Sequence, residues 1–254
     1  MWKTWKQVLF DPFNGFKDVS VGTKVGMPTL MCALLAMVIT ALLVPVMTHP
    51  AYQEALVRMQ VQTLEAMGQE LSEAQVSQME QQLSSPGIRT WSIVSSVVGS
   101  GISVVVGLLL VGVLVWVGAR VGGVAVRFRH AYAVGVFAYP VLLLGSLIRE
   151  ILVVSADPYA LFRNVRTSLD LGYALQPPLS LAAVLTPSDL GHVGYALVNA
   201  ATDIFSILYL VLLYAGLVSS VGVPRRKAVL VTVLFYVVFV AFSVVPVLFV
   251  PGAV

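Results

Sequence analysis

The chain has 254 residues, of which 58% are hydrophobic and only 11% are charged, and its mean hydropathy is +0.92. Soluble globular domains carry roughly 25% charged residues, so this composition excludes an ordinary soluble domain and predicts an integral membrane protein. The formal net charge is only +3, and the basic residues gather in short clusters beside apolar runs. That pattern favours contact with membrane lipids over binding of nucleic acid.

The first 26 residues are predicted to form a cytoplasmic amphipathic segment that lies on the membrane surface. Aromatic and basic residues recur there at three- and four-residue steps, which is typical of an interfacial helix. Asp11-Pro12 predicts a helix start, with Asp as the N-cap and Pro at the first helical position. Charges mixed with aromatic rings are not typical of a signal peptide. The expected interfacial anchor residues are Trp2, Trp5, Phe13 and Phe16.

Residues 27–254 are predicted to form one membrane domain with five transmembrane helices. A helix needs about 20 apolar residues to cross a hydrocarbon core of about 30 Å. The apolar runs that meet this need lie at about 28–47, 91–118, 131–148, 198–219 and 228–249. The expected fold class is therefore an all-α integral membrane protein.

The distribution of basic residues predicts the orientation of these spans. Lys and Arg in short loops beside spans are retained in the cytoplasm, so we expect a cytoplasmic N-terminus and an extracytoplasmic C-terminus in the cell (inner) membrane. Ten of the fifteen Lys and Arg residues fall on the side assigned to the cytoplasm: Lys3, Lys6, Lys17, Lys24, Arg120, Arg127, Arg129, Arg225, Arg226 and Lys227.

Residues 50–86 form the one polar insertion, and they are predicted to make an extracytoplasmic helical hairpin. An apolar stripe follows a Gln- and Glu-rich background, which favours amphipathic helices. Gly68 predicts a break between two helices. The pattern Ser72-x-x-Gln75 resembles a capping box and predicts the start of the second helix.

Within the spans, small residues and one proline suggest how the helices associate. Ser96, Ser100, Ser103 and Gly107 recur at four- and three-residue steps, and such stripes allow close helix packing in lipid; a conduction pathway is the alternative. Pro140 predicts a kink within the third span, because it interrupts the backbone hydrogen bonds. The apolar stretch 179–185 is too short to cross and is expected to rest in the interface or to re-enter the membrane.

Asp203, with Asn199 and Thr202 beside it, is the candidate intramembrane polar site. A charged side chain in hydrocarbon is unfavourable unless it is paired or hydrated, so it is a functional hypothesis by default. The first alternative is a structural role, in which Asp203 bonds to its neighbours or to Arg149. The second is a proton or ion site.

The sequence contains no pattern that predicts a metal site, a cofactor site or a catalytic centre. The three histidines, His49, His130 and His192, are expected at separate span ends and on different sides of the membrane, which is incompatible with one metal cluster. There is no phosphate-binding glycine loop and no G-x-S-x-G motif. We therefore expect a protein that is not an enzyme.

Several local sequences, taken in order, resemble the YIP1 family of five-span membrane proteins. The N-terminal match is Val8-Leu9-Phe10-Asp11-Pro12-Phe13. The central match is Gly122-Gly123, then Phe128-Arg129-His130-Ala131-Tyr132-Ala133-Val134 and Ala138-Tyr139-Pro140. The C-terminal match is Thr202-Asp203-Ile204-Phe205-Ser206-Ile207-Leu208-Tyr209, then Leu212-Leu213-Tyr214-Ala215-Gly216-Leu217 and Arg225-Arg226-Lys227-Ala228. The resemblance covers most of the chain outside 50–85.

The resemblance implies a trafficking or transport-accessory role without catalytic residues. Eukaryotic members of the family bind small GTPases of the Rab type and form hetero-oligomers, and some bacterial members are associated with ABC-type export systems. We therefore expect a membrane adaptor or assembly protein whose partners are membrane lipids and another membrane protein, such as an ABC-type export component, or a second copy of the chain. The alternative is a transporter or channel for a small solute, an ion or a lipid that uses Asp203.

Overall fold

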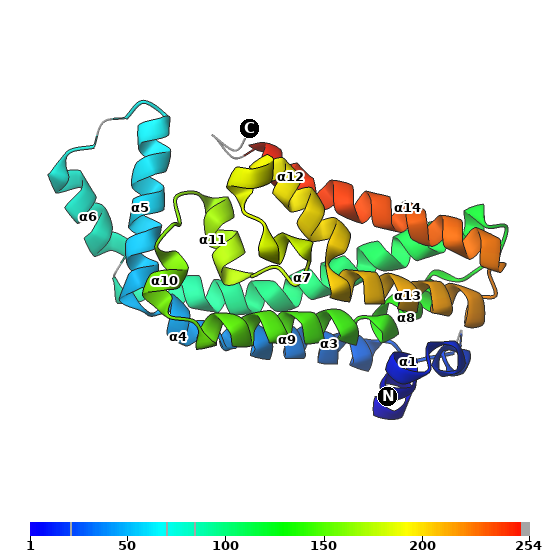
Figure 1. The fold of residues 1–254 in the computed structure, drawn as a ribbon. Coiled ribbons are helices and arrows are strands. Elements are labelled where there is room, and N and C mark those ends of the chain that lie inside the picture. Colours follow the sequence, from blue (N-terminus) through cyan, green and yellow to red (C-terminus); the bar gives the residue numbers. More distant parts are fainter. Residues whose placement is uncertain (21, 70, 84, 250–254) are drawn as a thin grey trace.

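A computed structural model describes residues 1–20, 22–69, 71–83 and 85–249. Within these ranges every regular element is a helix and none is a strand, which confirms the all-α prediction. The helices form an elongated bundle whose long axis is horizontal in Figure 1. Its main helices are α3 (Gly26–Ala41), α7 (Pro86–Val121), α8 (Phe128–Ala138), α9 (Pro140–Ser155), α12 (Pro187–Thr202), α13 (Ile204–Ser219) and α14 (Arg225–Val244).

Three helices in the described ranges are long and apolar enough to cross a membrane: Pro86–Val121, Phe128–Ser155 (α8 with α9) and Arg225–Val244. The pair formed by α12 and α13 is bent by 46°, and it makes a fourth candidate if both helices belong to one span. Helix α3 is apolar but has only 16 residues. It is followed by the short helix α4 (Val44–Met47). The chain is thus a membrane-type protein with three or four candidate spans.

Helix α8 is the most deeply buried helix near the end of the bundle that carries the N-terminus (Figure 1). All residues from His130 to Ala138 are buried, because α3, α7, α13 and α1 pack against this helix. Helix α9 begins at Pro140, which interrupts the hydrogen bonding of α8 because proline has no N–H to donate to the preceding turn. Tyr139 keeps helical dihedral angles (φ −58°, ψ −31°), so α8 and α9 continue as one candidate span.

A second, smaller core lies at the end of the bundle that carries the polar insertion. Helix α5 (Pro50–Ala66) and helix α10 (Pro158–Phe162) meet there through the rings of Tyr52 and Phe162, whose centroids are 5.4 Å apart. Arg58 on α5 donates hydrogen bonds to the carbonyl oxygens of Phe162 and Arg163 at 3.3 and 3.2 Å. Figure 1 shows α5 standing across the bundle axis, with α6 (Glu73–Leu83) projecting beyond it.

The turn between α5 and α6 has the features that the sequence predicts. Gly68 has a φ of +80°, a left-handed conformation that glycine adopts without the steric penalty of a side chain. The Ser72 N–H donates to Gln75 Oε1 at 2.8 Å, and the Gln75 N–H lies 3.4 Å from Ser72 Oγ. The predicted capping box at the start of the second helix is therefore confirmed.

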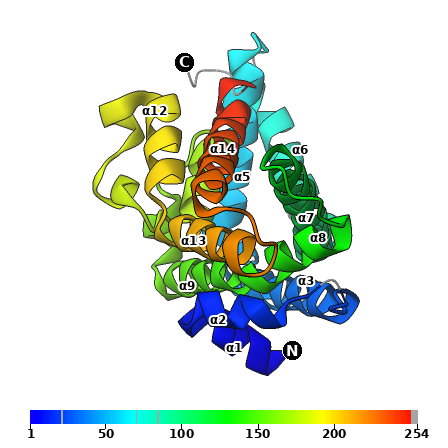
Figure 2. The ribbon, with the colours of Figure 1, turned by 90° about the vertical axis from the view of Figure 1, so that its right-hand side faces the viewer.

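The N-terminal helices pack near the opposite end of the bundle (Figure 1), and the end view in Figure 2 shows them below α9 and α13. They are α1 (Trp2–Phe10), α2 (Pro12–Gly15) and the short 3-10 helix η1 (Phe16–Asp18). Helix α2 begins at Pro12 with Asp11 as its N-cap residue, as predicted. The remaining elements are α11 (Ser168–Leu175), η2 (Leu181–Val184) and η3 (Val245–Phe249). Residues 179–185, expected at the interface or re-entering it, form the loop that carries η2.

The structure differs from the predicted spans at several places. The span expected at 28–47 is divided between α3 and α4, and the helix in the span expected at 228–249 ends at Val244. The span expected at 198–219 is not one continuous helix, because α12 ends at Thr202 and α13 begins at Ile204. The intervening Asp203 has an extended conformation (φ −63°, ψ 119°). The third span was expected to end at 148, but α9 continues to Ser155, so Arg149 and Glu150 belong to the helix.

Candidate functional site

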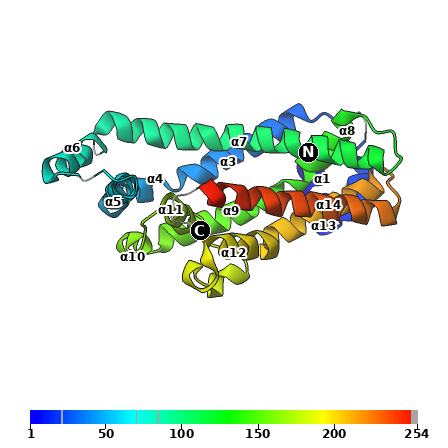
Figure 3. The same cartoon turned by 90° about the horizontal axis from the view of Figure 1, so that it is seen from above.

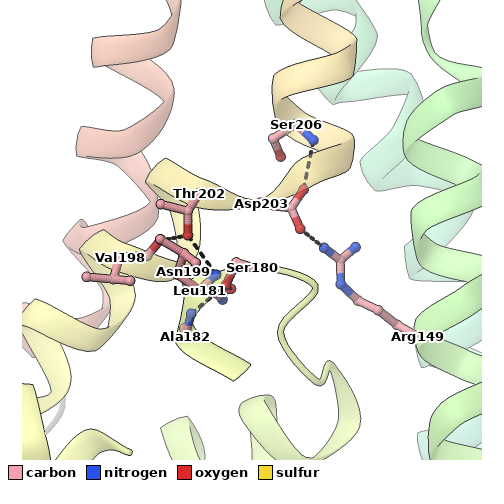
Figure 4. A network of polar contacts seen from close by, with 9 residues as sticks. All are labelled: Arg149, Ser180, Leu181, Ala182, Val198, Asn199, Thr202, Asp203 and Ser206. Carbon is pink, nitrogen blue, oxygen red and sulfur yellow. Dashed lines mark hydrogen bonds and ion pairs between the residues drawn. The ribbon is translucent and has the colours of Figure 1, made fainter. Parts of the chain in front are cut away.

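Asp203 lies at the break between α12 and α13 and is only 5% exposed. Its Oδ1 accepts a hydrogen bond at 2.7 Å from the backbone N–H of Ser206, which caps α13. Its Oδ2 accepts a hydrogen bond from the guanidinium of Arg149 on α9, and the two side chains form an ion pair (Figure 4). A buried carboxylate is unfavourable unless it is both paired and hydrogen-bonded. Asp203 meets both conditions.

Asn199 and Thr202 lie close to Asp203 but form hydrogen bonds with a different segment, the one that leads into η2. Asn199 Oδ1 accepts a hydrogen bond from the hydroxyl of Ser180 at 2.8 Å. Thr202 Oγ1 accepts one from the backbone N–H of Leu181 at 3.0 Å. Figure 4 shows these two contacts on one side of α12 and the Asp203 contacts on the other. The three residues predicted as one polar site therefore fix two different neighbours, the loop before η2 and helix α9.

The helix break itself is held by groups from outside the two helices. The N–H of Ile204 donates to the carbonyl oxygen of Leu179 at 3.2 Å, and the hydroxyl of Tyr236 on α14 donates to the carbonyl oxygen of Ala201 at 2.6 Å. Backbone groups at helix ends have no partner in their own helix, and lipid offers none. The loop and α14 supply partners for these two backbone groups.

Glu150 is a second buried acid, and the expected span boundary at 148 placed it outside the membrane. It is 7% exposed, and its Oε2 atom has no hydrogen-bond partner among the described residues. A span boundary read from hydropathy alone tends to stop at the first charged pair, here Arg149-Glu150. In the structure the helix continues through both residues, and Arg149 is paired with Asp203.

The described residues contain no group of three or more His, Cys, Asp or Glu side chains that could hold a metal ion. The histidines lie in three places. His49 accepts a hydrogen bond from the Ala51 N–H at the start of α5 (3.2 Å), and His192 lies 3.8 Å from Asp170. His130 contacts the Val19 carbonyl oxygen at 3.2 Å and the Ser220 hydroxyl at 2.7 Å, which ties the N-terminal segment to α8 and α13.

Helix α7 packs on a face next to the predicted small-residue stripe. Ser96, Ser100 and Gly107 are half-buried and Ser103 is exposed. The buried residues of α7 are Gly101, Val104, Leu108, Gly112, Val115, Gly118 and Ala119. A Cβ atom on Gly118 would lie 2.4 Å from Val231 Cγ1 of α14. Close approach at small residues thus occurs in this helix, through Gly118 and its buried neighbours.

The four predicted anchor residues divide into two pairs. Trp2 and Phe13 are exposed, whereas Trp5 and Phe16 are buried. The Trp5 ring lies 6.4 Å from the ring of Phe137 on α8. The structure therefore places Trp5 and Phe16 in the protein core, and leaves Trp2 and Phe13 available to lipid.

Comparison with known proteins identifies the family. The model of the Yip1 domain matches residues 6–245, which is most of the chain. The chain belongs to the Yip1 family. No curated protein and no solved structure matches it. The family assignment confirms the resemblance carried by the sequence motifs, and the matched region of this Yip1-family protein includes the α5–α6 segment, where no motif was found.

One feature of this Yip1-family protein was not predicted from its sequence. A cavity of about 500 Å³ lies between α7, α9, α13 and α14. Of the predicted site residues, only Gly107 lines it. Aromatic residues recur on α14 at three- and four-residue steps, at Phe235, Phe239 and Phe242, and all three line the cavity. That aromatic stripe is the sequence signal that could have indicated it.

Proposed function

We propose that this protein is a non-enzymatic multi-pass membrane adaptor that binds other membrane proteins and serves an export or trafficking assembly. The observation that carries the proposal is the α5–α6 pair, which projects from the end of the bundle (Figure 1). Helix α6 has no buried residue among those described. A polar helix that packs so little on its own chain is suited to contact with another protein.

The proposal includes a preferred type of partner surface. Glu54, Glu65 and Glu73 are exposed on the α5–α6 pair, while Arg58 is engaged with the carbonyl groups beside α10. The exposed charge of the pair is therefore mostly negative. Complementary charge favours a partner with a basic extramembrane surface, such as a component of an ABC-type export system; a second copy of the chain is the alternative partner.

We further propose five spans in the cell (inner) membrane, with the N-terminus in the cytoplasm and the C-terminus outside. Helices α3 with α4, α7, α8 with α9, α12 with α13, and α14 would each cross once. Segments assigned to the cytoplasm meet at one end of the bundle: Lys227 Nζ donates to the carbonyl oxygen of Gly122 at 2.9 Å. Arg89 donates to the carbonyl oxygen of Thr48 at the other end. Segments assigned to the same side of the membrane therefore lie at the same end of the bundle, which supports spans that cross in alternating directions.

The contacts of Asp203 give less support to a transporter for ions or small solutes. Both carboxylate oxygens are engaged, one by Arg149 and one by the Ser206 N–H. An ion carrier needs a charged group that can exchange its partner during transport. The same geometry is well suited to joining α9, α12 and α13 in a rigid scaffold.

The adaptor proposal is tested by photocrosslinking in native membranes. A photoreactive amino acid is placed at Gln78, an exposed position of α6, and in a control chain at Leu230, which is 69% exposed on α14. We expect the Gln78 position to yield one dominant protein adduct in stoichiometric amount, identified by mass spectrometry, and Leu230 to yield none of it. Equal or absent protein adducts at both positions would contradict the proposal.

A further inference from the structure

The cavity between α7, α9, α13 and α14 has a wall of apolar side chains at the level of the candidate spans. Its volume is about 500 Å³, and its walls include Gly107, Leu110, Tyr209, Phe235 and Phe239. Ligand cavities in proteins have volumes of roughly 300–1,000 Å³. The space is therefore large enough for a ligand of many non-hydrogen atoms.

The cavity opens sideways between α7 and α14. Leu110 on α7 is 60% exposed and Phe242 on α14 is 72% exposed, and both line the cavity. Figure 2, which views the bundle along its axis, shows α14 and α7 above α13, with α7 to the right of α14. Since both helices are candidate spans, the opening faces the hydrocarbon of the bilayer.

The chemistry of the walls determines what fills the cavity. Water needs two to four polar partners, and apolar cavities of about 150 Å³ stay dry. An empty space would deprive the lining atoms of their dispersion contacts. The hydrocarbon chain of a lipid provides those contacts and is present at the opening in high concentration.

Among the described residues, only apolar atoms form the accessible surface of the cavity. Ser206 lines the cavity, and its backbone N–H is bonded to the carboxylate that pairs with Arg149. Tyr209 contributes its ring to the wall, whereas its hydroxyl is buried and lies 3.9 Å from where a Cβ atom on Gly135 of α8 would be. An acyl chain, which has no hydrogen-bonding group along its length, matches this surface.

We propose that the cavity is a binding site for a membrane phospholipid, with one acyl chain held between α7 and α14. The site is separate from the α5–α6 pair that carries the proposed adaptor function. A lipid held there fills the space between α14 and the rest of the bundle.

The test uses the full-length protein in vesicles of phosphatidylethanolamine and phosphatidylglycerol. The vesicles contain a trace of a phospholipid with a diazirine on its acyl chain, and labelled peptides are mapped after illumination. Gly107→Leu places a side chain in the cavity, and a Cβ at this position meets nothing within 4 Å. Gly99→Leu is the matched control, because Gly99 lies on the same helix, also meets nothing within 4 Å, and is not a wall residue.

We expect labelling of 107–114 and 235–242 in the native protein and in Gly99→Leu, and its loss in Gly107→Leu. Unchanged labelling of these segments in Gly107→Leu would show only the lipid that surrounds any membrane protein, and would overturn the proposal. A chain-to-chain crosslink in place of the lipid adduct would also overturn it, in favour of a second copy. If Gly107→Leu does not fold, Val238→Trp, at a wall position of α14, and its exposed neighbour Val237→Trp give the same comparison.

Discussion

Asp203 accepts one hydrogen bond from the start of α13 and forms one ion pair with α9, and these two contacts respond differently to substitution. Asparagine caps a helix about as well as aspartate, so Asp203→Asn keeps the first contact and loses the second. Alanine keeps neither. Replacing Arg149 is expected to cost more stability than replacing Asp203, because it leaves the Asp203 carboxylate buried without a countercharge.

We predict that Arg149→Ala lowers the free energy of unfolding by about 3–5 kcal/mol, the usual effect of removing one member of a buried ion pair. Asp203→Asn is expected to lower the free energy of unfolding by less, because the Arg149 side chain left without its partner is partly exposed and can reach solvent or headgroups. The double variant is expected to lose less than the sum of the single variants. Thermal unfolding in detergent micelles measures these changes. Additive losses would contradict a direct pair, and Asp157→Asn, which alters the exposed cap of α10, is the control.

At the scale of single elements, glycine determines how closely two helices approach. A Cβ atom on Gly145 of α9 would lie 2.7 Å from Cγ and 2.9 Å from Cβ of Phe205 on α13. Neither atom is the far end of a flexible side chain, so the two helices would have to move apart. Glycine is thus required at this contact by packing and not by a special backbone conformation.

Gly145→Ala is expected to destabilise the protein by about 1–3 kcal/mol, as overpacking does in other tightly packed sites. Gly99→Ala is the control, because it has open space at the Cβ position and gains helix propensity of up to about 1 kcal/mol. Thermal unfolding of the two variants in the same detergent should therefore shift in opposite directions. A shift of the same sign and size would count against the close contact of α9 and α13.

Gly68 offers a second test at this scale, in the turn between α5 and α6. Its φ of +80° is unfavourable for alanine by about 1–2 kcal/mol. Gly68→Ala is expected to speed amide hydrogen exchange in α5 and α6 while exchange in α8 stays unchanged. Gly87→Ala, near the start of α7 and with open space at its Cβ, should leave all three helices unaffected.

Local features of these elements were predictable because they depend on nearby residues. The cap at Ser72 and Gln75 and the helix start at Asp11-Pro12 are decided within a single turn. The packing face of α7 was not predictable in the same way. One face of this helix contacts protein and the other contacts lipid, so both are built from small and apolar residues. The spacing of apolar residues along the sequence therefore does not show which face packs against protein.

The break at Asp203 depends on residues still further away in the sequence. Arg149, Leu179 and Tyr236 stabilise it from three other elements. The sequence therefore identified Asp203 as an unusual residue and Arg149 as one possible partner, but not the interruption of the helix. The cavity is likewise formed by four helices and could not be derived from any one of them.

At the scale of the whole molecule, the proposed five-span topology predicts which residues are accessible from each side. In a Cys32→Ala background, Ser77→Cys on α6 is expected to react with a membrane-impermeant thiol reagent in intact cells. Lys3→Cys is expected to react only after the membrane is permeabilised. The measurement is the labelled fraction by gel shift. Reaction of both residues in intact cells, or of neither, would contradict the proposed orientation.

The position of α14 has a consequence for the order in which the protein is made. Only 11% of its apolar window is buried, yet it forms one wall of the cavity, and in the view from above it lies beside α13 (Figure 3). Chains emerge from the ribosome with the N-terminal part first, so α7, α9 and α13 are already in the bilayer when α14 is inserted. A lipid chain can therefore occupy the open site before its last wall exists, and need not pass through a finished protein.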